Sequence, residues 1–588
     1  MINNKSTTPP KAQLAFRIGV TGHRTNRLAQ ADQAPISART REVVEHIRDS
    51  VLAVLDENDV RSTYIPDEPL LRVISPLAEG SDRLVAHVAL DLGFDLQCLL
   101  PFQRDDYEKD FASAASQAEY RDLLNQASAV FELDGSRETP QRETAAYQAV
   151  GRMVLKHCDV LIAIWDGQSP EGRGGTGQIV EEALRLQIPT VWIKSQAPYE
   201  TCYLQLDDYG NRQELPLDKL ATRLRTILFP PEPTENDLCR TYFAEKRRCW
   251  TLLGIFYPLF VKLMTQGKLG KPAICLADIE QSTRQEWEAG WQAAPTFPRE
   301  IAQQIGERFI PPYGWADKLA VYYANLYRSD FVVSYLLSGL AVLLAISGFV
   351  GAELITILLI LVNIGVGSYR RWHARWIDYR LLAEQIRQMH FLAPLGRTTP
   401  AFHPPAYHSY DDPEHSWINW YFRAVIRTAG LPNARLDTAY LAAYQALLRH
   451  EINGQVNYHG HNAERSHLLL DRLHVTAYVF FILTLPVCFA HLVYDGAYSH
   501  WLTLFAVIFP AFGAAIAGIL GQGEYERITK RSKAMQDQLQ EMVDKLDEAP
   551  RLSSESLGEI AEEAAEIMTS EVLDWRVVFR ARPLVLPA

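Results

Sequence analysis

The stretch FVVSYLLSGLAVLLAISGFV (331–350) carries no charged residue, and a second apolar run, LITILLILVNIGVGS (354–368), follows almost at once. As a helix the first run would rise about 30 Å, which matches the hydrocarbon thickness of a membrane. The same pairing returns at 475–494 and 501–521. We therefore expect an all-α membrane region with four transmembrane helices in two hairpins. The alternative is a pair of apolar hairpins buried in a soluble domain.

Basic residues flank these runs on one side only. SYRRWHARWIDYR (368–380) follows the second run and RITKRSK (527–533) follows the fourth, whereas the short connections GAE (351–353) and DGAYSH (495–500) contain no Lys or Arg. The positive-inside rule then places both termini in the cytoplasm. The first residues, MINNKSTTPPKAQ, lack the apolar core of a signal peptide.

Polar and small residues within the runs predict how the helices pack. Asn363 is the most polar of them, and it is expected either to bond across helices or to line a pore, with packing the favoured reading. Gly365 and Gly518 would allow helices to approach closely. The runs contain no Asp, Glu, Lys or Arg, which argues against coupled transport, because transport normally requires such groups within the membrane.

Residues before the membrane region alternate strand-like and helical patterns. The strand candidates are AFRIGV (15–20), LRVIS (71–75), LQCLLP (96–101), SAVFEL (128–133), DVLIAIW (159–165) and PTVWIK (189–194). Several are continuous apolar runs, as in parallel strands that are covered on both faces. The pattern predicts an α/β Rossmann-like domain with a doubly wound sheet.

Four regions are expected along the chain. They are an α/β sensing domain (1–230), a helical juxtamembrane linker (231–320), a first two-span hairpin (321–397), and cytoplasmic helices with the second hairpin and C-terminal helices (398–588). PPYGW (311–315) should interrupt the chain before the helix that leads into the first span, because proline disrupts helices.

Three glycine-containing segments should meet at the carboxyl edge of the sheet: GVTGHR (19–24), ISPLAEGSDRLVAHVALDLG (74–93) and IAIWDGQSPEGRGGTGQIVEEALRL (162–186). Glycine lets the backbone approach a ligand, and a helix N-terminus attracts phosphate. Plain tight turns, with Ser81 or Asp82 as a helix cap, are the alternative. The residues expected to bind ligand are Gly19, Thr21, Gly22, His23, Arg24, Ser75, Glu79, Gly80, Ser81, Asp82, Asp166, Gly174, Gly175, Thr176, Gly177 and Glu181.

Composition excludes some classes of protein. The net charge of −12 argues against binding nucleic acid, which requires a basic face. The seven cysteines show no CxxC spacing, so we expect reduced thiols without a disulfide frame or a metal site. His459 and His461 would point about 200° apart on a helix and cannot share a metal ion from one face.

The glycine-containing segments resemble two known families. In the third segment, Gly174, Gly175, Gly177 and Glu181 fall on the PGGxGTxxE motif of LOG cytokinin-activating phosphoribohydrolases, with Arg173 in place of the proline and Gln178 in place of the threonine. The second segment is similar to the SGxARGID motif of DNA-processing protein A, with Pro76 in place of a glycine and Glu79 in place of an arginine. Both families belong to the SLOG superfamily.

The membrane half resembles the SLATT class of two-span effector domains. The similarity lies in ADKLAVYYANLYRSDF before the first span and RWIDYRLLAEQIR after the second. Proteins that join SLOG to SLATT are effectors of bacterial conflict systems. The resemblance implies a multi-pass protein of the bacterial inner membrane, part of antiviral defence and abortive infection, whose SLOG domain senses a nucleotide second messenger that a separate enzyme produces.

The expected function is a nucleotide-gated effector whose oligomers form a pore or disrupt the bilayer. The ligand would be a cyclic oligonucleotide or an ADP-ribose derivative, with no cofactor and no catalytic residue. The first alternative, implied by the LOG resemblance, is a tethered phosphoribohydrolase that cleaves an N-glycosidic bond with Glu181, Arg24 and Arg173. A tethered scaffold without a ligand is the other alternative.

Overall fold

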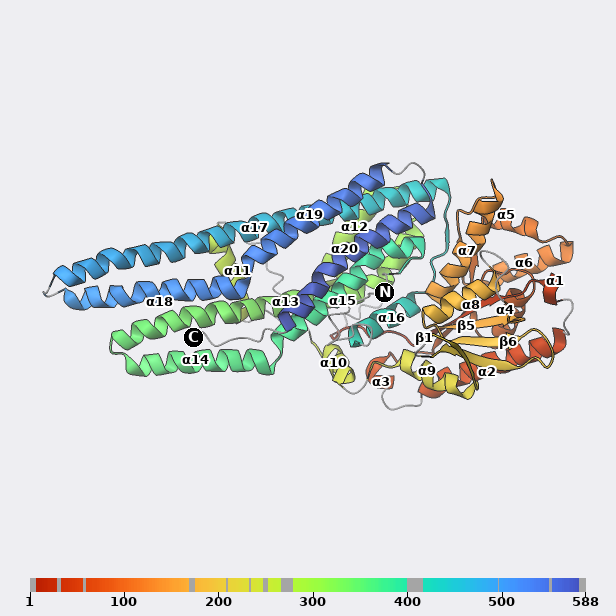
Figure 1. Ribbon diagram of the computed structural model, residues 1–588, viewed down its shortest axis with the longest axis horizontal. Coiled ribbons are helices and arrows are strands. Elements are labelled where there is room, and N and C mark those ends of the chain that lie inside the picture. The colour runs from red at the N-terminus through yellow and green to blue at the C-terminus, as the bar shows by residue number, and fades with distance from the viewer. Residues whose placement is uncertain are drawn as a thin grey trace.

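The computed structural model joins an α/β part at one end to two long apolar hairpins at the other, with a group of helices between them (Figure 1). The described residues are 7–28, 33–55, 60–168, 175–207, 210–231, 234–246, 252–265, 279–398, 416–494, 496, 498–548 and 552–580. The predicted combination of an α/β part and an apolar helical part is confirmed at this level.

The α/β part contains a sheet with the strand order β8-β7-β6-β5-β1-β2-β3-β4-β9. The strands are β1 Ala15–Gly22, β2 Leu70–Ser75, β3 Asp95–Leu100, β4 Ala129–Glu132, β5 Val160–Trp165, β6 Thr190–Lys194, β7 Thr201–Leu206, β8 Arg212–Leu215 and β9 Ala434–Arg435. Strands β1 to β6 are parallel and match the six predicted runs. Strands β7 and β8 extend one side as an antiparallel hairpin.

Helices between the strands cover the sheet. They are α1 Thr25–Leu28, α2 Gln33–Leu55, α3 Val60–Thr63, α4 Ser81–Asp91, α5 Arg104–Tyr107, η1 Glu108–Asp110, α6 Ala114–Gln126, α7 Pro140–His157, α8 Thr176–Arg185 and α9 Asp218–Leu228. Helix α2 packs with α4 and α9, whereas α7 packs with α8. Strands β2 to β4 follow one another on one side of β1, whereas β5 and β6 lie on its other side. The strand order therefore reverses between β1 and β5, and the connections leave these two neighbouring strands in opposite directions.

The rest of the chain is helical. The helices are α10 Thr234–Phe243, α11 Leu252–Thr265, α12 Ile279–Ala293, α13 Arg299–Ile346, α14 Val350–Tyr369, α15 Trp372–Leu392, η3 Ala393–Leu395, α16 Trp417–Ala429, α17 Thr438–Val493, α18 Ser499–Gly523, α19 Tyr525–Glu548 and α20 Ser554–Arg580. Helix α11 packs on α13 and α17.

Among the described residues, 4 helices are long and apolar enough to cross a membrane, as predicted. Helices α13 and α14 form one hairpin and α17 and α18 form the other (Figure 1). In the most apolar 18-residue stretch of α17, only 6% is buried inside the protein. Large apolar side chains such as Val475, Phe481 and Leu485 are therefore exposed, and such a surface requires an apolar surrounding.

Two local predictions about the first hairpin were wrong. The chain turns at 347–349, where Gly348 has a φ of 78°, and not at 351–353, which already belongs to α14. Glu353 therefore lies in the first turn of a helix. Helix α13 also continues through Pro311 and Pro312, and it passes the predicted domain boundary at 320/321. Burial of neighbours such as Tyr313 and Trp315 favours the helix despite the lost hydrogen bonds.

The two hairpins pack against each other through α13 and α18. A Cβ added at Gly518 would lie 2.2 Å from the Tyr335 ring, so the close approach requires glycine there. Gly365 has no atom within 4 Å of an added Cβ. Asn363 of α14 donates to Ser334 Oγ over 3.2 Å, to the Asp330 carbonyl over 3.3 Å and to the Asp330 carboxylate.

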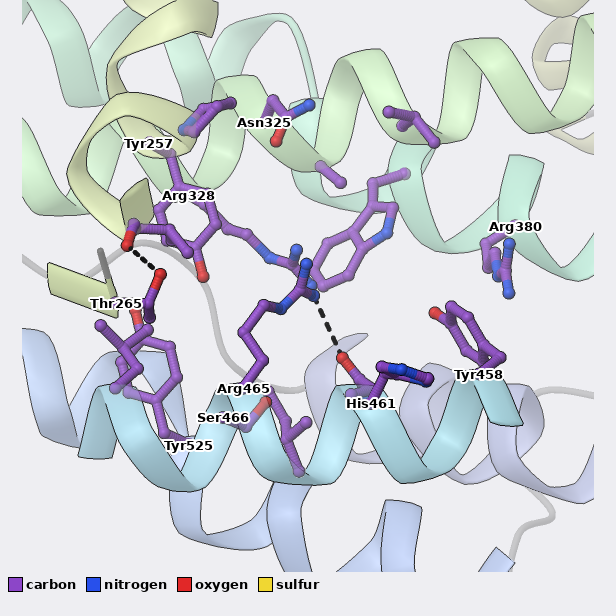
Figure 2. A pocket seen from close by; sticks show the side chains of 18 of the residues that line it. Tyr257, Thr265, Asn325, Arg328, Arg380, Tyr458, His461, Arg465, Ser466 and Tyr525 are labelled. Atoms are coloured by element: carbon purple, nitrogen blue, oxygen red, sulfur yellow. Dashed lines mark hydrogen bonds between the residues drawn. The ribbon is translucent and has the colours of Figure 1, made fainter. Parts of the chain in front are cut away.

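A cavity of about 780 Å³ lies where the long apolar helices meet the other helices, and it is lined by residues of α11, α13, α15, α17, α19 and α20 (Figure 2). Every side chain that Figure 2 labels comes from this helical part. The cavity is therefore separate from the edge of the sheet on which the ligand was predicted to bind.

Candidate functional site

The reversal of the strand order brings the ends of β1 and β5 together. His23 follows β1, and Asp166 follows β5 directly. The Nε2 of His23 lies 3.1 Å from the backbone amide nitrogen of Asp166 and 3.2 Å from Asp166 Oδ1. Asp166 Oδ1 also accepts from the Gln168 amide over 3.1 Å. In open parallel sheets, ligands bind outside the carboxyl ends of strands at such a reversal. The first and third predicted segments therefore meet at the position that the fold favours for a ligand.

The N-terminus of α4 packs directly on the turn after β1. The amide and the hydroxyl of Ser81 both donate to the His23 carbonyl, over 3.1 and 2.9 Å. A Cβ added at Gly22 would lie 2.4 Å from Ser81 Cβ, and one added at Gly80 would lie 2.7 Å from the His23 oxygen. Gly80 also has a φ of 99°. Both glycines are thus required by close packing, whether or not a ligand is bound.

Asp82 is buried beneath this turn. One of its carboxylate oxygens accepts from the Ala78 amide over 3.2 Å, and its carbonyl accepts from Ser75 Oγ over 3.2 Å. Burial raises the pKa of Asp82 to about 7, although the Ala78 amide and the positive charges of Arg24 and Arg83 lower it. Asp82 thus holds the loop before α4 and can change charge near neutral pH.

Other predicted residues of the first two segments have different surroundings. A Cβ at Gly19 would lie 2.7 Å from Cys158 Cβ, so Gly19 faces the end of α7. Thr21 is half-buried near the end of β1. The half-buried Glu79 accepts a hydrogen bond from the Ser116 hydroxyl.

The third segment is described only in part. Arg173 and Gly174 lie outside the described residues. Gly175 caps α8, which begins with Thr176 and Gly177. Glu181 is 56% exposed and lies 3.8 Å from Arg185 of the same helix. Its carboxylate therefore has a solvent-exposed position.

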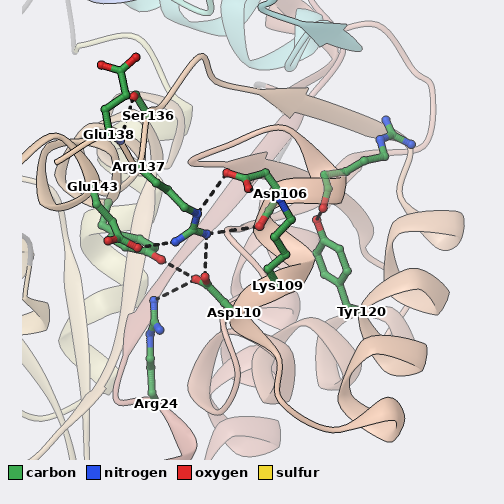
Figure 3. Close-up of polar contacts among 11 residues, drawn as sticks. Arg24, Asp106, Lys109, Asp110, Tyr120, Ser136, Arg137, Glu138 and Glu143 are labelled. Carbon is green, nitrogen blue, oxygen red and sulfur yellow. Dashed lines mark hydrogen bonds and ion pairs between the residues drawn. The ribbon is translucent and has the colours of Figure 1, made fainter. Parts of the chain in front are cut away.

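A charged network centred on Arg137 lies at the same edge and includes Arg24 (Figure 3). Half-exposed Arg24 lies 3.9 Å from Asp110 and 5.1 Å from the centre of the Tyr147 ring. Arg137 contacts Asp110 over 2.6 Å and Asp106 over 3.1 Å. Tyr147 donates a hydrogen bond to Asp110. The pKa of Tyr147 is raised mainly by its burial and further by this hydrogen bond. Only Arg24 of this network was predicted, because the other residues belong to no recognisable motif.

The opposite edge of the sheet holds a second charged cluster, which connects the two halves of the chain. Arg17 contacts Asp159 through Nε and Nη2, both over 3.1 Å, and Arg427 of α16 lies 3.8 Å from the same carboxylate. Arg72 donates to the carbonyls of Arg427 and Thr428. Burial lowers the pKa of Arg72 to about 10, with further lowering from Arg308 and Arg17.

We call the contacts between the sheet and the helical part the junction, which comprises this cluster, β9 and the loop after η3. Strand β9 pairs with β4 through Phe131 and Ala434. His157 Nε2 lies 2.6 Å from the Gly396 carbonyl oxygen. Burial lowers the pKa of His157 to about 4, helped by Arg17 and opposed by the Gly396 carbonyl. No pattern in the sequence predicts the junction, because its partners are hundreds of residues apart.

Within the described ranges, no group of three or more His, Cys, Asp or Glu side chains could hold a metal ion. Comparison with known proteins gives no further guide, since no family model, curated protein or solved structure matches the chain. Function must therefore be inferred from the two edges of the sheet and from the hairpins.

Proposed function

We propose that this protein is a membrane effector gated by a nucleotide-derived ligand. The observation that carries the proposal is the convergence of His23, Asp166 and the glycine-dependent start of α4 at the strand reversal of the sheet. A ligand that binds at a strand reversal of this kind contacts backbone amides and helix N-termini, which favour phosphate. Half-exposed Arg24 adds a positive charge at this edge.

The effector half of the proposal rests on the hairpins and the junction. Four apolar helices with one internal amide, Asn363, cannot form a wide aqueous channel within a single chain, so the active state is a homo-oligomer in the bilayer. The buried cluster of Arg17, Asp159 and Arg427 joins the sheet directly to the helical part. A ligand shifts the assembly only by binding one state more tightly than the other.

The family resemblance extends this proposal. A SLOG-like, Rossmann-like domain would receive a cyclic oligonucleotide or an ADP-ribose derivative from a separate enzyme, and a SLATT-like region would act on the bacterial inner membrane. Both termini would lie in the cytoplasm, as the flanking basic residues indicate. The resulting leak would arrest growth of an infected cell.

The experiment is dye efflux from liposomes that contain the full-length protein. Candidate nucleotides are first screened by the shift that they cause in the thermal unfolding midpoint, and those that bind are then added to the liposomes. Ligand-dependent efflux supports the proposal. Binding without efflux contradicts it, and the absence of binding by any nucleotide favours a tethered scaffold.

A membrane-tethered phosphoribohydrolase is the second candidate function. It is motivated by the position of Glu181 on α8, the helix that begins at this edge of the sheet. Its exposed ion pair with Arg185 does not place the carboxylate against a reacting atom. Release of a free base from a nucleotide panel, lost in Glu181→Ala, would establish this activity.

A further inference from the structure

The proposed gating assigns no role to the residues that line the cavity between the helices next to the apolar hairpins. Its volume of about 780 Å³ falls within the range of small-molecule pockets, roughly 300–1,000 Å³. Its wall includes apolar residues such as Val261, Leu469 and Ile528, and its charged lining residues are four cations and one carboxylate: Lys262, Arg328, Arg380, Arg465 and Glu464. A ligand that fills it must therefore combine an anionic group with apolar surface.

Two arginines point into this cavity from opposite sides. Figure 2 shows Arg328 of α13 and Arg465 of α17 with their guanidinium groups turned toward each other. Within the described part of the chain, no carboxylate forms an ion pair with either arginine, although Arg465 donates to Asn462 Oδ1 over 3.1 Å. Two like charges that face each other without a carboxylate between them are stabilised by a bound anion.

Aromatic rings hold one of these arginines in place. The Arg328 guanidinium carbon lies 4.9 Å from the centre of the Trp376 ring and 5.4 Å from that of Tyr257. Such stacking fixes the plane of a guanidinium group and leaves its edge free for phosphate. Arg380, which also lines the cavity, lies 3.5 Å from both Asp317 and Glu384, so it is already neutralised.

The cavity lies beside the ends of the apolar runs, and it reaches from Arg328 near the first run to Arg465, which precedes the run at Val475 by ten residues, about 15 Å along a helix. Arg328 precedes the apolar run at Phe331 by three residues, about 5 Å along a helix. Trp376 follows the end of α14 closely, and Tyr525 begins α19 directly after α18. The headgroup region adds roughly 5–8 Å on each side of the hydrocarbon core. Basic pockets between transmembrane helices on the cytoplasmic side of a membrane bind the headgroups of anionic lipids.

We propose that the cavity binds the phosphate of an anionic phospholipid between Arg328 and Arg465, with the glycerol and the start of the acyl chains against its apolar wall. This lipid would connect α13 of the first hairpin with α17 of the second, and it would make their relative position depend on the lipid composition. The proposal stands independently of any ligand at the sheet.

The test uses the full-length protein reconstituted in nanodiscs of phosphatidylglycerol and phosphatidylcholine. After extraction into detergent and gel filtration, the retained lipids are quantified by mass spectrometry. We expect the wild type to retain phosphatidylglycerol selectively and the Arg328→Gln/Arg465→Gln variant to lose most of it. Because Arg328 also packs on Trp376, the single variant Arg465→Gln, at an exposed position, separates lipid loss from misfolding.

Arg370→Gln is the matched control, since Arg370 is an exposed arginine directly after α14 that does not line the cavity. It should retain as much phosphatidylglycerol as the wild type. Equal retention by the wild type and by both cavity variants would overturn the proposal, as would equal loss in Arg370→Gln. Glycerol 3-phosphate and inorganic phosphate, added to nanodiscs of phosphatidylcholine alone, should not raise the unfolding midpoint. If one of these soluble compounds raised the midpoint by as much as the inclusion of phosphatidylglycerol in the nanodisc does, the site would belong to a soluble phosphate compound instead.

Discussion

The two edges of the central sheet differ in how far their charged side chains are buried. At the carboxyl edge, Arg24 and its partners remain partly exposed, and glycines bring three chain segments close together. At the other edge, Arg17, Arg72 and Arg427 are almost fully buried around Asp159. A charged group that stays near solvent is available to a ligand, whereas a buried cluster fixes the geometry of the parts that it joins. The difference supports our proposal that a ligand binds at the first edge, whereas the second edge connects the sheet to the helical part.

Removing the carboxylate from the buried edge should have the largest effect. Asp159→Ala would leave Arg17 and Arg427 without their shared partner, and the loss of one member of a buried ion pair costs about 3–5 kcal/mol. We expect a large drop in the unfolding midpoint of the full-length protein in detergent. Glu42→Ala removes the exposed ion pair with Arg39 and should change stability by no more than about 1 kcal/mol. Similar midpoints for the two variants would refute the distinction between the edges.

The open edge should be most sensitive at Gly80. Gly80→Ala adds a methyl group against the His23 carbonyl at a φ of 99°, for which we expect a loss of about 2–3 kcal/mol and of ligand binding. Gly93 at the end of α4 also has a positive φ, but an added Cβ there meets no atom within 4 Å. Gly93→Ala should therefore cost only about 1 kcal/mol and leave binding intact, as calorimetric titration would measure. Equal binding by both variants would argue against a site at Gly80.

The two edges should also respond oppositely to pH. The pKa of Asp82 is raised from 3.8 to about 7, so its contribution to stability is largest at low pH and is lost as the pH rises through 7. The pKa of His157 is lowered from 6.5 to about 4, so its contribution is present above 6.5 and is lost as the pH falls to 4.

Unfolding midpoints of two variants across pH 4–8 would separate these contributions. Relative to the wild type, Asp82→Asn should gain stability as the pH rises, because the amide remains neutral. His157→Gln should gain stability relative to the wild type as the pH falls, because glutamine does not titrate and can still donate to the Gly396 carbonyl. Parallel curves for the wild type and both variants would show that neither group is shifted.

The smallest effect is expected at Glu181. Its ion pair with Arg185 is exposed, so Glu181→Ala should change the free energy of unfolding by no more than about 0.5 kcal/mol. Under the effector proposal, ligand-dependent efflux should also be unchanged. Loss of a nucleotide-cleaving activity in this variant would instead favour the phosphoribohydrolase.

Local patterns in the sequence predicted the parts of the fold that are local in space. The apolar runs of β1 to β6 and of the four long helices are continuous, and each specifies its own element. The predicted turn at 351–353 lies too far along the chain, because Gly348 makes the turn and Glu353 already belongs to α14.

The junction could not be predicted in the same way. The two residues of β9 carry no periodic signal, and the bond from the Val130 amide to Asn433 Oδ1 spans 303 residues. Arg427 lies within an otherwise apolar face of α16, where its partner Asp159 cannot be inferred from spacing. The same holds for the candidate site. Its glycine motifs can be recognised in the sequence, whereas the contacts of Asp110, Arg137 and Tyr147 cannot.

The central claim, that a ligand at the sheet controls the membrane helices, is tested most directly by conductance across a planar bilayer that contains the full-length protein. A nucleotide that binds in solution is titrated onto the side that carries the α/β part. We expect conductance to rise with nucleotide concentration along the binding curve in the wild type and in Gly93→Ala, and not to rise in Gly80→Ala. Saturating binding without any change in conductance would contradict it.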